Sequence, residues 1–173
     1  LKRLSAADSA SRAELVPQIV EHVLAQRLRE VIAPDELLPI VLAALAEERS
    51  LAGWDGLGFV VQTYQKRARP LVDWIVALAR ATNRRLMVRL VKGAYWDTEI
   101  KRAQVDGLVD YPVFTRKVHT DVAYLACAKA LLAAGDAVYP QFATHNAFTI
   151  AAVTVLAGDR PFEFQCLHGM GET

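Results

Sequence analysis

Cysteine and histidine are scarce in this sequence, and their placement argues against disulfide and metal frameworks. Cys127 and Cys166 are the only cysteines among 173 residues, so we expect no disulfide scaffold and a reducing, cytoplasmic setting. The four histidines show neither the HxxxH nor the HxH spacing that is typical of metal sites. The sequence therefore predicts no bound metal.

Three glycine-based motifs are also missing. The nine glycines form no Gly-x-Gly-x-x-Gly turn, no Gly-x-x-x-x-Gly-Lys-Ser/Thr loop and no Gly-x-Ser-x-Gly elbow. Their absence weighs against a dinucleotide-binding turn, a phosphate-cradling loop and a Ser/His/Asp hydrolase.

Charge of one sign and long apolar runs are absent too. Lys and Arg number 20 against 19 Asp and Glu, so we expect no nucleic-acid partner. The longest apolar run, Pro39 to Ala46, falls short of the roughly 18 residues of a membrane helix, and Leu1 to Leu4 opens no secretory signal. We expect a soluble, cytoplasmic protein, with peripheral contact at the inner membrane left open.

The sequence that is present divides near residue 50. Before that point it predicts helices. Glu14 to Arg29 carries apolar side chains at helical spacing with Pro17 near the start, and Asp35 can cap a second helix.

From residue 51 onward, predicted strands and helices alternate. The predicted strands are Gly56 to Tyr64, Leu86 to Val91, Val138 to Ala143 and Phe162 to Leu167. The predicted helices begin at Pro70, at about Thr98, at about Arg116 and within FTIAAVTVLAG, the third of them ending at Gly135. This alternation predicts a parallel α/β sheet whose strands are apolar on both faces.

Polar residues at the strand ends favour a barrel over a doubly wound sheet. They gather at successive carboxyl ends: Gln62, then Arg89 and Lys92, then Thr144 to Asn146, then Gln165 and His168. Barrel enzymes build their sites from that rim. Because eight units need about 250 residues, we predict a (β/α)8-type barrel that is incomplete in this chain. Residues 1–50 then form a helical N-terminal segment (arm or early barrel region), and residues 51–173 the central part of the barrel.

The strand around Arg89 carries the most informative residues. A buried guanidinium needs a carboxylate, a ligand or solvent beside it, so Arg89 marks either a site or a structural ion pair. Lys92 and Gly93 suit a plain turn, or the close approach of an anion or an electron-rich ring. Tyr95 and Trp96 suit the core as well as a cofactor.

A second polar group follows the next strand directly. Adjacent polar side chains there need partners, so Thr144, His145 and Asn146 either cap the following helix or meet a ligand. Gln62 hydrogen-bonds either a ligand or a neighbouring strand. With neither an acid/base dyad nor a metal, this set favours chemistry carried by an organic cofactor.

Five segments carry a resemblance to a known family. They are GFVVQTYQKR, LMVRLVKGAYWDTEIKRAQ, YPVFTRKVHTDVAYLACAKALL, YPQFATHNAFTIAAV and FEFQCLHGMGE. In this order they resemble the proline dehydrogenase domain of bacterial proline utilization A, over roughly Leu51 to Glu172. The resemblance implies a distorted (β/α)8 barrel that binds FAD and oxidises L-proline to 1-pyrroline-5-carboxylate. Hydride transfer to flavin N5 and electron transfer to a membrane quinone are implied with it.

The same resemblance assigns roles to individual residues. Arg89 lies beside the reactive edge of the flavin, where a guanidinium stabilises developing negative charge, and Lys92 is the second catalytic candidate. The implied cofactor-binding residues are Gln62, Arg89, Val91, Lys92, Gly93, Ala94, Trp96, Thr144, His145, Asn146, Gln165 and Cys166. The implied substrate contacts are Tyr95 and Leu167.

The family binds the substrate carboxylate with an arginine pair on a later helix, which these residues do not include, and no general base is evident. We therefore expect part of a larger, homo-oligomeric protein with an NAD-dependent glutamate semialdehyde dehydrogenase elsewhere. Two alternatives stay open: a non-catalytic flavin-binding barrel fragment, and a barrel lyase with Lys92 as the Schiff-base amine.

Overall fold

The computed structural model describes residues 9–27 and 34–167 and contains one parallel sheet within them. Its strands are β1 (Gly58–Gln62), β2 (Leu86–Val91), β3 (Val138–Ala143) and β4 (Glu163–Gln165), and they lie in the order β1-β2-β3-β4. A doubly wound sheet reverses its strand order at a switch point, whereas a barrel adds strands in sequence. The predicted fold class, an incomplete (β/α)8-type barrel, is therefore confirmed.

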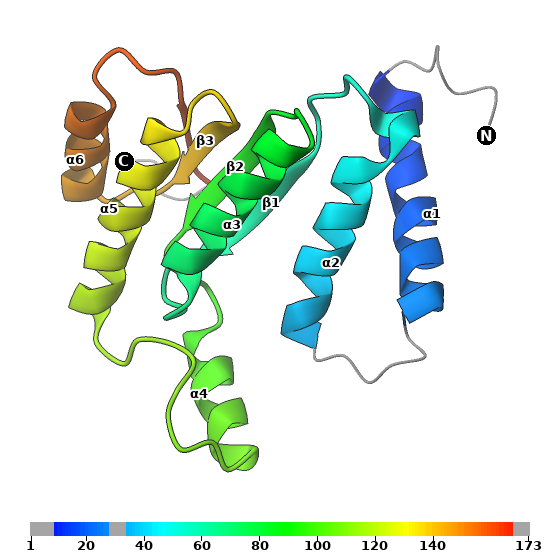
Figure 1. Ribbon diagram of the computed structural model, residues 1–173. Coiled ribbons are helices and arrows are strands. Elements are labelled where there is room, and N and C mark those ends of the chain that lie inside the picture. The colour runs from blue at the N-terminus through cyan, green and yellow to red at the C-terminus, as the bar shows by residue number, and fades with distance from the viewer. Residues whose placement is uncertain (1–8, 28–33, 168–173) are drawn as a thin grey trace.

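Helices cover one side of this sheet. They are α1 (Ser9–Arg27), α2 (Pro34–Glu47), α3 (Ala68–Ala81), α4 (Trp96–Val105), α5 (Lys117–Ala133) and α6 (Ala147–Ala157), with the 3-10 helix η1 (Arg49–Leu51) after α2. Figure 1 shows α3 and α5 side by side over the strands, α1 beside α2 beyond β1, and α4 projecting past the carboxyl end of β2. Within the described residues, no helix is both long and apolar enough to cross a membrane.

The two faces of the sheet differ in chemistry. Along β2, Leu86, Val88 and Leu90 are fully buried beneath the helices, while the alternate residues Met87, Arg89 and Val91 are only partly buried. Strand side chains alternate between faces, so one face is an apolar core and the other is an open, partly polar surface. The prediction of strands that are apolar on both faces is wrong, because helices cover only one face among the described residues.

The strand register arranges the open face in rows. Arg89 is paired with Val60 on one side and with Gln141 on the other, and Gln141 is paired with Glu163. One step nearer the carboxyl ends, Gln62 is paired with Val91 and Ala143 with Gln165. Partners in a parallel pair share a face, so residues far apart in sequence form the floor of one surface.

The N-terminal helices share the core of the sheet. Val41, Leu42, Leu45 and Ala46 of α2 belong to the same buried cluster as the strand residues. Arg84, just before β2, donates three hydrogen bonds to backbone carbonyls at the end of α2 and in η1: Nε to Ala46 O at 2.5 Å, Nη1 to Leu51 O at 2.7 Å and Nη2 to Glu48 O at 3.0 Å. Two of these carbonyls also accept backbone hydrogen bonds, Glu48 O from Leu51 N at 3.2 Å and Leu51 O from Trp54 N at 3.1 Å. The guanidinium adds a charged donor to all three and joins α2 and η1 to the sheet.

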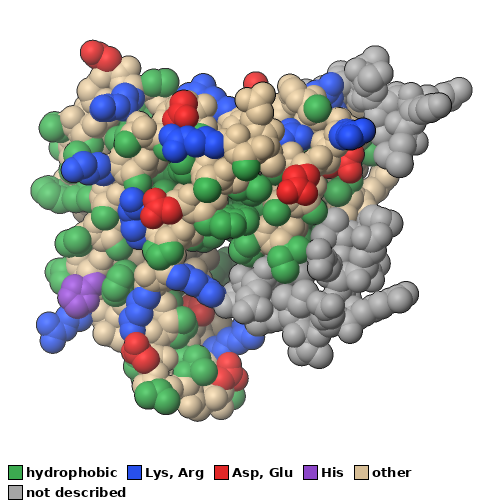
Figure 2. Space-filling model, viewed as in Figure 1, with side chains coloured by type: hydrophobic (Ala, Val, Ile, Leu, Met, Phe, Trp, Pro, Cys, Tyr) green, Lys and Arg blue, Asp and Glu red, His purple; other side chains and the backbone are tan. Residues whose placement is uncertain are grey.

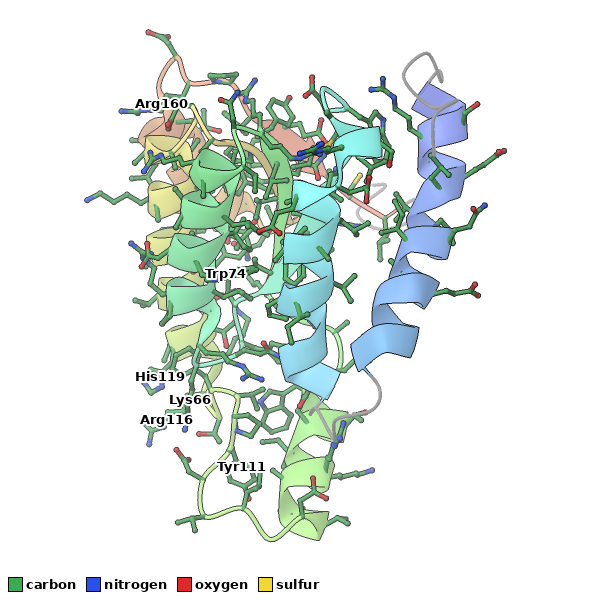
Figure 3. The ribbon with its side chains drawn as sticks, turned by 45° about the vertical axis from the view of Figure 1, so that its right-hand side comes forward. Lys66, Trp74, Tyr111, Arg116, His119 and Arg160 are labelled. Atoms are coloured by element: carbon green, nitrogen blue, oxygen red, sulfur yellow. The ribbon has the colours of Figure 1, made fainter. Side chains whose placement is uncertain are left out.

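The loop between α4 and α5 returns to the end of β1. Lys66 N donates to Pro112 O at 3.0 Å, and Lys66 Nζ lies 2.5 Å from Asp110 Oδ2. Figure 3 shows Lys66, Arg116 and His119 near one another at the start of α5, with Tyr111 farther along beside α4. Charges of both signs are interspersed with apolar side chains on the face seen in Figure 2.

Several predicted boundaries need correction. Helix α1 starts at Ser9, so Pro17 lies inside it, and α2 starts at Pro34, which places Asp35 inside the helix instead of at its cap. Helix α5 ends at Ala133 with Ala134 as its cap, so Gly135 follows the cap as predicted, but it does not adopt the positive φ of a C-terminal glycine. A proline or a glycine marks a permitted helix end without requiring one.

Two further predictions near the sheet also change. The helix predicted to begin at Pro70 begins at Ala68 as α3 and buries Val72, Ile75 and Ala79, whereas Trp74 is 36% exposed. Strand β4 covers only Glu163–Gln165, shorter than predicted, because its paired register with β3 spans three residues.

Candidate functional site

A cavity of about 680 Å³ opens at the carboxyl ends of the four strands. It is lined by Val60, Gln62, Arg89, Val91, Lys92, Gly93, Ala94, Tyr95, Lys117, Ala143, Thr144, His145, Asn146, Gln165, Cys166 and Leu167. Among the described residues, every residue predicted for the site except Trp96 lines this cavity. The volume is within the range of small-molecule sites, roughly 300–1,000 Å³.

Arg89 occupies the floor of the cavity with an unmatched donor. Its Nε is buried, and no hydrogen-bond acceptor reaches it from the described residues. A second hollow of about 600 Å³ continues along the open face past Met87, Gln141 and Arg89. A buried unpaired donor costs free energy, and the residue that carries this one lines the cavity.

Lys92 lies at the end of β2 and is held by an ion pair. Its Nζ lies 2.6 Å from Asp121 Oδ1 and 3.2 Å from Thr149 Oγ1, and 5.8 Å from the centre of the Tyr124 ring. Asp121 also accepts from Lys117 Nζ at 2.6 Å. Partial burial would raise the pKa of Asp121, but the hydrogen bonds from Lys117 and Lys92 outweigh it and hold that pKa below its usual range.

The turn after β2 has the shape that Gly93 permits. Gly93 has a φ of +133°, and a Cβ there would lie 2.5 Å from Tyr64 Cδ1. The close contact observed at this glycine is made by Tyr64, and Gly93 also lines the cavity. Tyr64 is anchored in turn, since its N donates to Lys92 O at 2.8 Å and its hydroxyl lies 3.5 Å from Glu99 Oε1. Burial, and then the charge of Glu99, raise the pKa of Tyr64 to about 12.

The aromatic residues after Gly93 separate in space. Tyr95 lines the cavity and is 65% exposed, so it is available to a ligand. Trp96 begins α4, and its Nε1 donates to Phe114 O at 2.9 Å. This bond turns the indole toward the returning loop, which explains why Trp96 is not part of the cavity lining.

The segment after β3 caps the following helix, as predicted, and also lines the cavity. Asn146 caps α6, because its Oδ1 accepts from Thr149 N at 3.0 Å. Thr144 Oγ1 accepts from Asn146 N at 3.2 Å. His145 is exposed toward the cavity, and no hydrogen bond joins its side chain to another described residue. Capping fixes the turn and leaves the imidazole free for a ligand.

The outer strands complete the lining. Gln62 at the end of β1 has no side-chain hydrogen bond to a described residue, so its amide also faces the cavity without a partner. Gln165 Nε2 donates to Glu163 Oε1 at 2.6 Å. Cys166 and Leu167 are exposed at the rim. His168, predicted for the same rim, lies outside the described residues.

The charge of the cavity is positive. Arg89, Lys92 and Lys117 line it, while Asp121, which lies behind the wall, is the carboxylate paired with both lysines. Three cations against one carboxylate suit a ligand that is anionic or that gains negative charge in the reaction.

Three residues that line the cavity were not predicted from the sequence. Val60 and Ala143 are apolar, and only the strand register shows that they share a face with Arg89 and Gln165. Lys117 belongs to a short basic pair with Arg116, a pattern typical of a solvated helix end. The sequence signal that could have identified Lys117 is Asp121, four residues later on the same helix, with which it forms an ion pair.

Known proteins resemble the chain in both sequence and structure. The sequence model of the family described as Proline dehydrogenase matches residues 32–173. The "Bifunctional protein PutA" of Escherichia coli (strain K12) is 62% identical over 136 residues, which cover 76% of this chain and 10% of that protein.

Two solved structures illustrate the similarity of fold. The D779Y mutant of proline utilization A from Bradyrhizobium japonicum aligns with a TM-score of 0.79 and 52% identity, covering 95% of this chain and 18% of the other. Proline utilization A from Bdellovibrio bacteriovorus, inactivated by N-propargylglycine, aligns with a TM-score of 0.75 and 36% identity. That alignment covers 78% of this chain and 14% of the other. The chain thus spans about a tenth of the length of its curated relatives.

Proposed function

The chain belongs to the proline dehydrogenase family, and from this premise we propose that its cavity holds FAD for the oxidation of L-proline. The proposed product is 1-pyrroline-5-carboxylate, and the proposed electron acceptor is a membrane quinone. We propose a cytoplasmic location with peripheral contact at the inner membrane, within a larger homo-oligomeric protein. The observation that carries the proposal is the unpaired, buried Nε of Arg89 on the cavity floor.

The residues present fit a flavin on several counts. The cavity of about 680 Å³ is large enough for a sizeable part of such a cofactor. Gln62 and His145 offer polar groups without partners among the described residues, and Lys92 and Lys117 offer positive charge. Gly93, Ala94 and Val91 supply a flat, small wall where backbone can approach a planar ring.

The positions of these residues indicate a role for each in the proposed reaction. Bound FAD would supply the acceptor for the hydride that leaves the substrate. Arg89 provides a fixed positive group in a partly buried site, where it stabilises developing negative charge without reorganising. Tyr95 and Leu167, exposed on opposite segments of the rim, are proposed to contact the proline ring.

In this proposal, Lys92 serves as a fixed cation and not as a nucleophile. Its amine is engaged by Asp121 and Thr149, whereas a Schiff-base lysine must present a free amine to a carbonyl. The family membership and this geometry both favour the oxidoreductase over the lyase.

The absorbance spectrum tests the proposal directly. We expect the chain, refolded with FAD and freed of excess, to keep a flavin band, and L-proline to bleach that band under anaerobic conditions. D-proline is the control, since the oxidation is proposed for the L-isomer. A folded chain that retains no flavin would overturn the proposal.

Two further outcomes are informative. A band that L-proline leaves unchanged would support the alternative of a flavin-binding barrel fragment without catalysis. N-propargylglycine inactivates the Bdellovibrio relative, so we expect it to alter the flavin spectrum of this chain irreversibly if the substrate site is complete.

A further inference from the structure

Behind the cavity wall, Asp121 and Thr149 form a hydrogen-bonded relay with Lys92. Lys92 Nζ donates to Asp121 Oδ1 at 2.6 Å and to Thr149 Oγ1 at 3.2 Å. These contacts bring together the end of β2, the second turn of α5 and the first turn of α6. The partners of Lys92 are 29 and 57 residues away in the sequence.

The relay continues to the segment after β3. Thr149 Oγ1 lies 3.0 Å from Asn146 Oδ1, and Thr149 N donates to the same oxygen at 3.0 Å. A threonine hydroxyl has one proton and two lone pairs. Its proton is therefore donated to Asn146 while a lone pair accepts from Lys92, and both ends of the relay depend on this one group.

Neither Asp121 nor Thr149 lines the cavity, but each holds residues that do. Thr149 is 4% exposed, and its partners Lys92 and Asn146 both line the cavity. Asp121 holds two lining lysines, Lys92 and Lys117. Thr149 is buried and Lys92 and Asp121 are partly buried, so losing a shared member leaves its partners with fewer hydrogen bonds, and the members keep one arrangement together.

We propose that Asp121 and Thr149 are positioning residues that couple the segment after β2 to the segment after β3 and so set the shape of the cavity. The relay keeps Lys92 at a fixed distance from the turn that carries His145 and Asn146. The identity of the ligand rests on the proposed function, because only that function says that the two coupled segments bind a flavin.

Amide hydrogen exchange of the ligand-free chain tests the coupling without any ligand. We expect Thr149→Val to speed exchange both at residues 144–147 and at residues 92–95, on the far wall. Thr149→Ser keeps the hydroxyl and should restore slow exchange at both segments. Thr154→Val is the matched control, since Thr154 Oγ1 donates only to Ile150 O on the exposed side of the same helix.

The exchange data have two decisive patterns. Faster exchange at 92–95 in Thr149→Val and in Asp121→Asn, but not in Thr154→Val, supports the relay. A change confined to α6, or one that is equal in Thr149→Ser and Thr149→Val, overturns it, because either pattern would come from helix stability alone.

Flavin binding provides the second measurement. We expect Thr149→Val to raise the dissociation constant for FAD of the folded chain about tenfold, because one hydrogen bond from a charged donor is lost. Thr154→Val should bind as the unaltered chain does, and equal binding by both variants contradicts the relay. If the unaltered chain binds no flavin, the proposed function fails, while hydrogen exchange still decides whether the walls are coupled.

Discussion

Arg89 illustrates how a single residue can serve the site at the expense of stability. It lies on the open face of β2 between Val60 and Gln141, and its buried Nε has no partner among the described residues. An unpaired buried donor is destabilising, so the protein keeps an uncompensated polar group on a residue that lines the cavity. This kind of local cost is characteristic of functional positions.

We predict that Arg89→Met separates catalysis from stability. The ligand-free variant should be as stable as the unaltered chain, or more stable by about 1 kcal/mol, because no hydrogen bond of the Nε is lost. Flavin reduction by L-proline should slow about 100-fold, and the potential of the bound flavin should fall, since a preorganised positive group is removed. Thermal unfolding, stopped-flow absorbance and a redox titration measure the three quantities.

The neighbouring arginine provides the control for that experiment. Arg85 stacks over the Tyr139 ring at 5.3 Å and does not line the cavity. Arg85→Met should leave the rate of flavin reduction unchanged and cost at most about 1 kcal/mol of stability. An Arg89→Met variant that reduces flavin at the unaltered rate would remove the role assigned to Arg89.

Sequence reasoning reached Arg89 and missed Lys117 for a physical reason. A guanidinium inside an apolar strand is costly to bury, so its presence there signals a specific purpose. A lysine at the start of a helix is ordinary, and nothing local distinguishes Lys117 from a solvated cation. Its place in the cavity depends on how α5 packs against the end of β2.

At the scale of elements, Arg84 determines how the N-terminal helices meet the sheet. Its three hydrogen bonds go to carbonyls of Ala46, Glu48 and Leu51. Burial lowers the pKa of Arg84, although the charges of Asp55 and Glu48 oppose this shift. The guanidinium thus loses hydration on burial, and in return it donates hydrogen bonds to backbone carbonyls at the end of α2 and in η1.

We predict that Arg84→Met destabilises the chain by about 3 kcal/mol, because three carbonyls lose a charged donor together. Arg80→Met is the matched control. Arg80 also makes a two-pronged contact, with Asp136, but in solvent, so its loss should change the unfolding midpoint little. Urea unfolding of both variants gives the comparison, and equal midpoints would contradict the role of Arg84.

The elements themselves were largely predictable, and their ends were less so. Leu86 to Val91 and Val138 to Ala143 agree with β2 and β3, because each is an apolar run bounded by polar or turn residues. The starts of α1 and α2 differ from the prediction, since packing can extend a helix past a proline. Residues 1–50 as a separate segment remain a prediction.

At the scale of the whole molecule, apolar side chains remain exposed on two helices. Val118 and Val122 lie one turn apart on α5, with 61% and 68% exposed, and Phe148 and Val155 lie two turns apart on α6, with 71% and 83% exposed. Helix α6 is apolar almost throughout its length. Exposed apolar patches favour association with another surface.

We predict that the 173-residue chain self-associates at micromolar concentration and that Phe148→Lys with Val155→Lys reduces this association, since charge opposes the burial of both positions. Val109→Lys is the control, because Val109 is fully exposed on the loop after α4. Sedimentation velocity measures the change. Equal association by the double variant and the control would show that α6 is not the surface involved.

Periodicity and local polarity are encoded over a few residues, so the parallel α/β class, the strands and the polar strand ends that line the cavity could be predicted from the sequence. Which residues meet depends on the folded chain. The row that pairs Val60, Arg89, Gln141 and Glu163, the relay from Asp121 through Lys92 to Thr149, and the three bonds of Arg84 all join distant segments. Such contacts depend on strand register and helix packing, which are set by burial of the whole core.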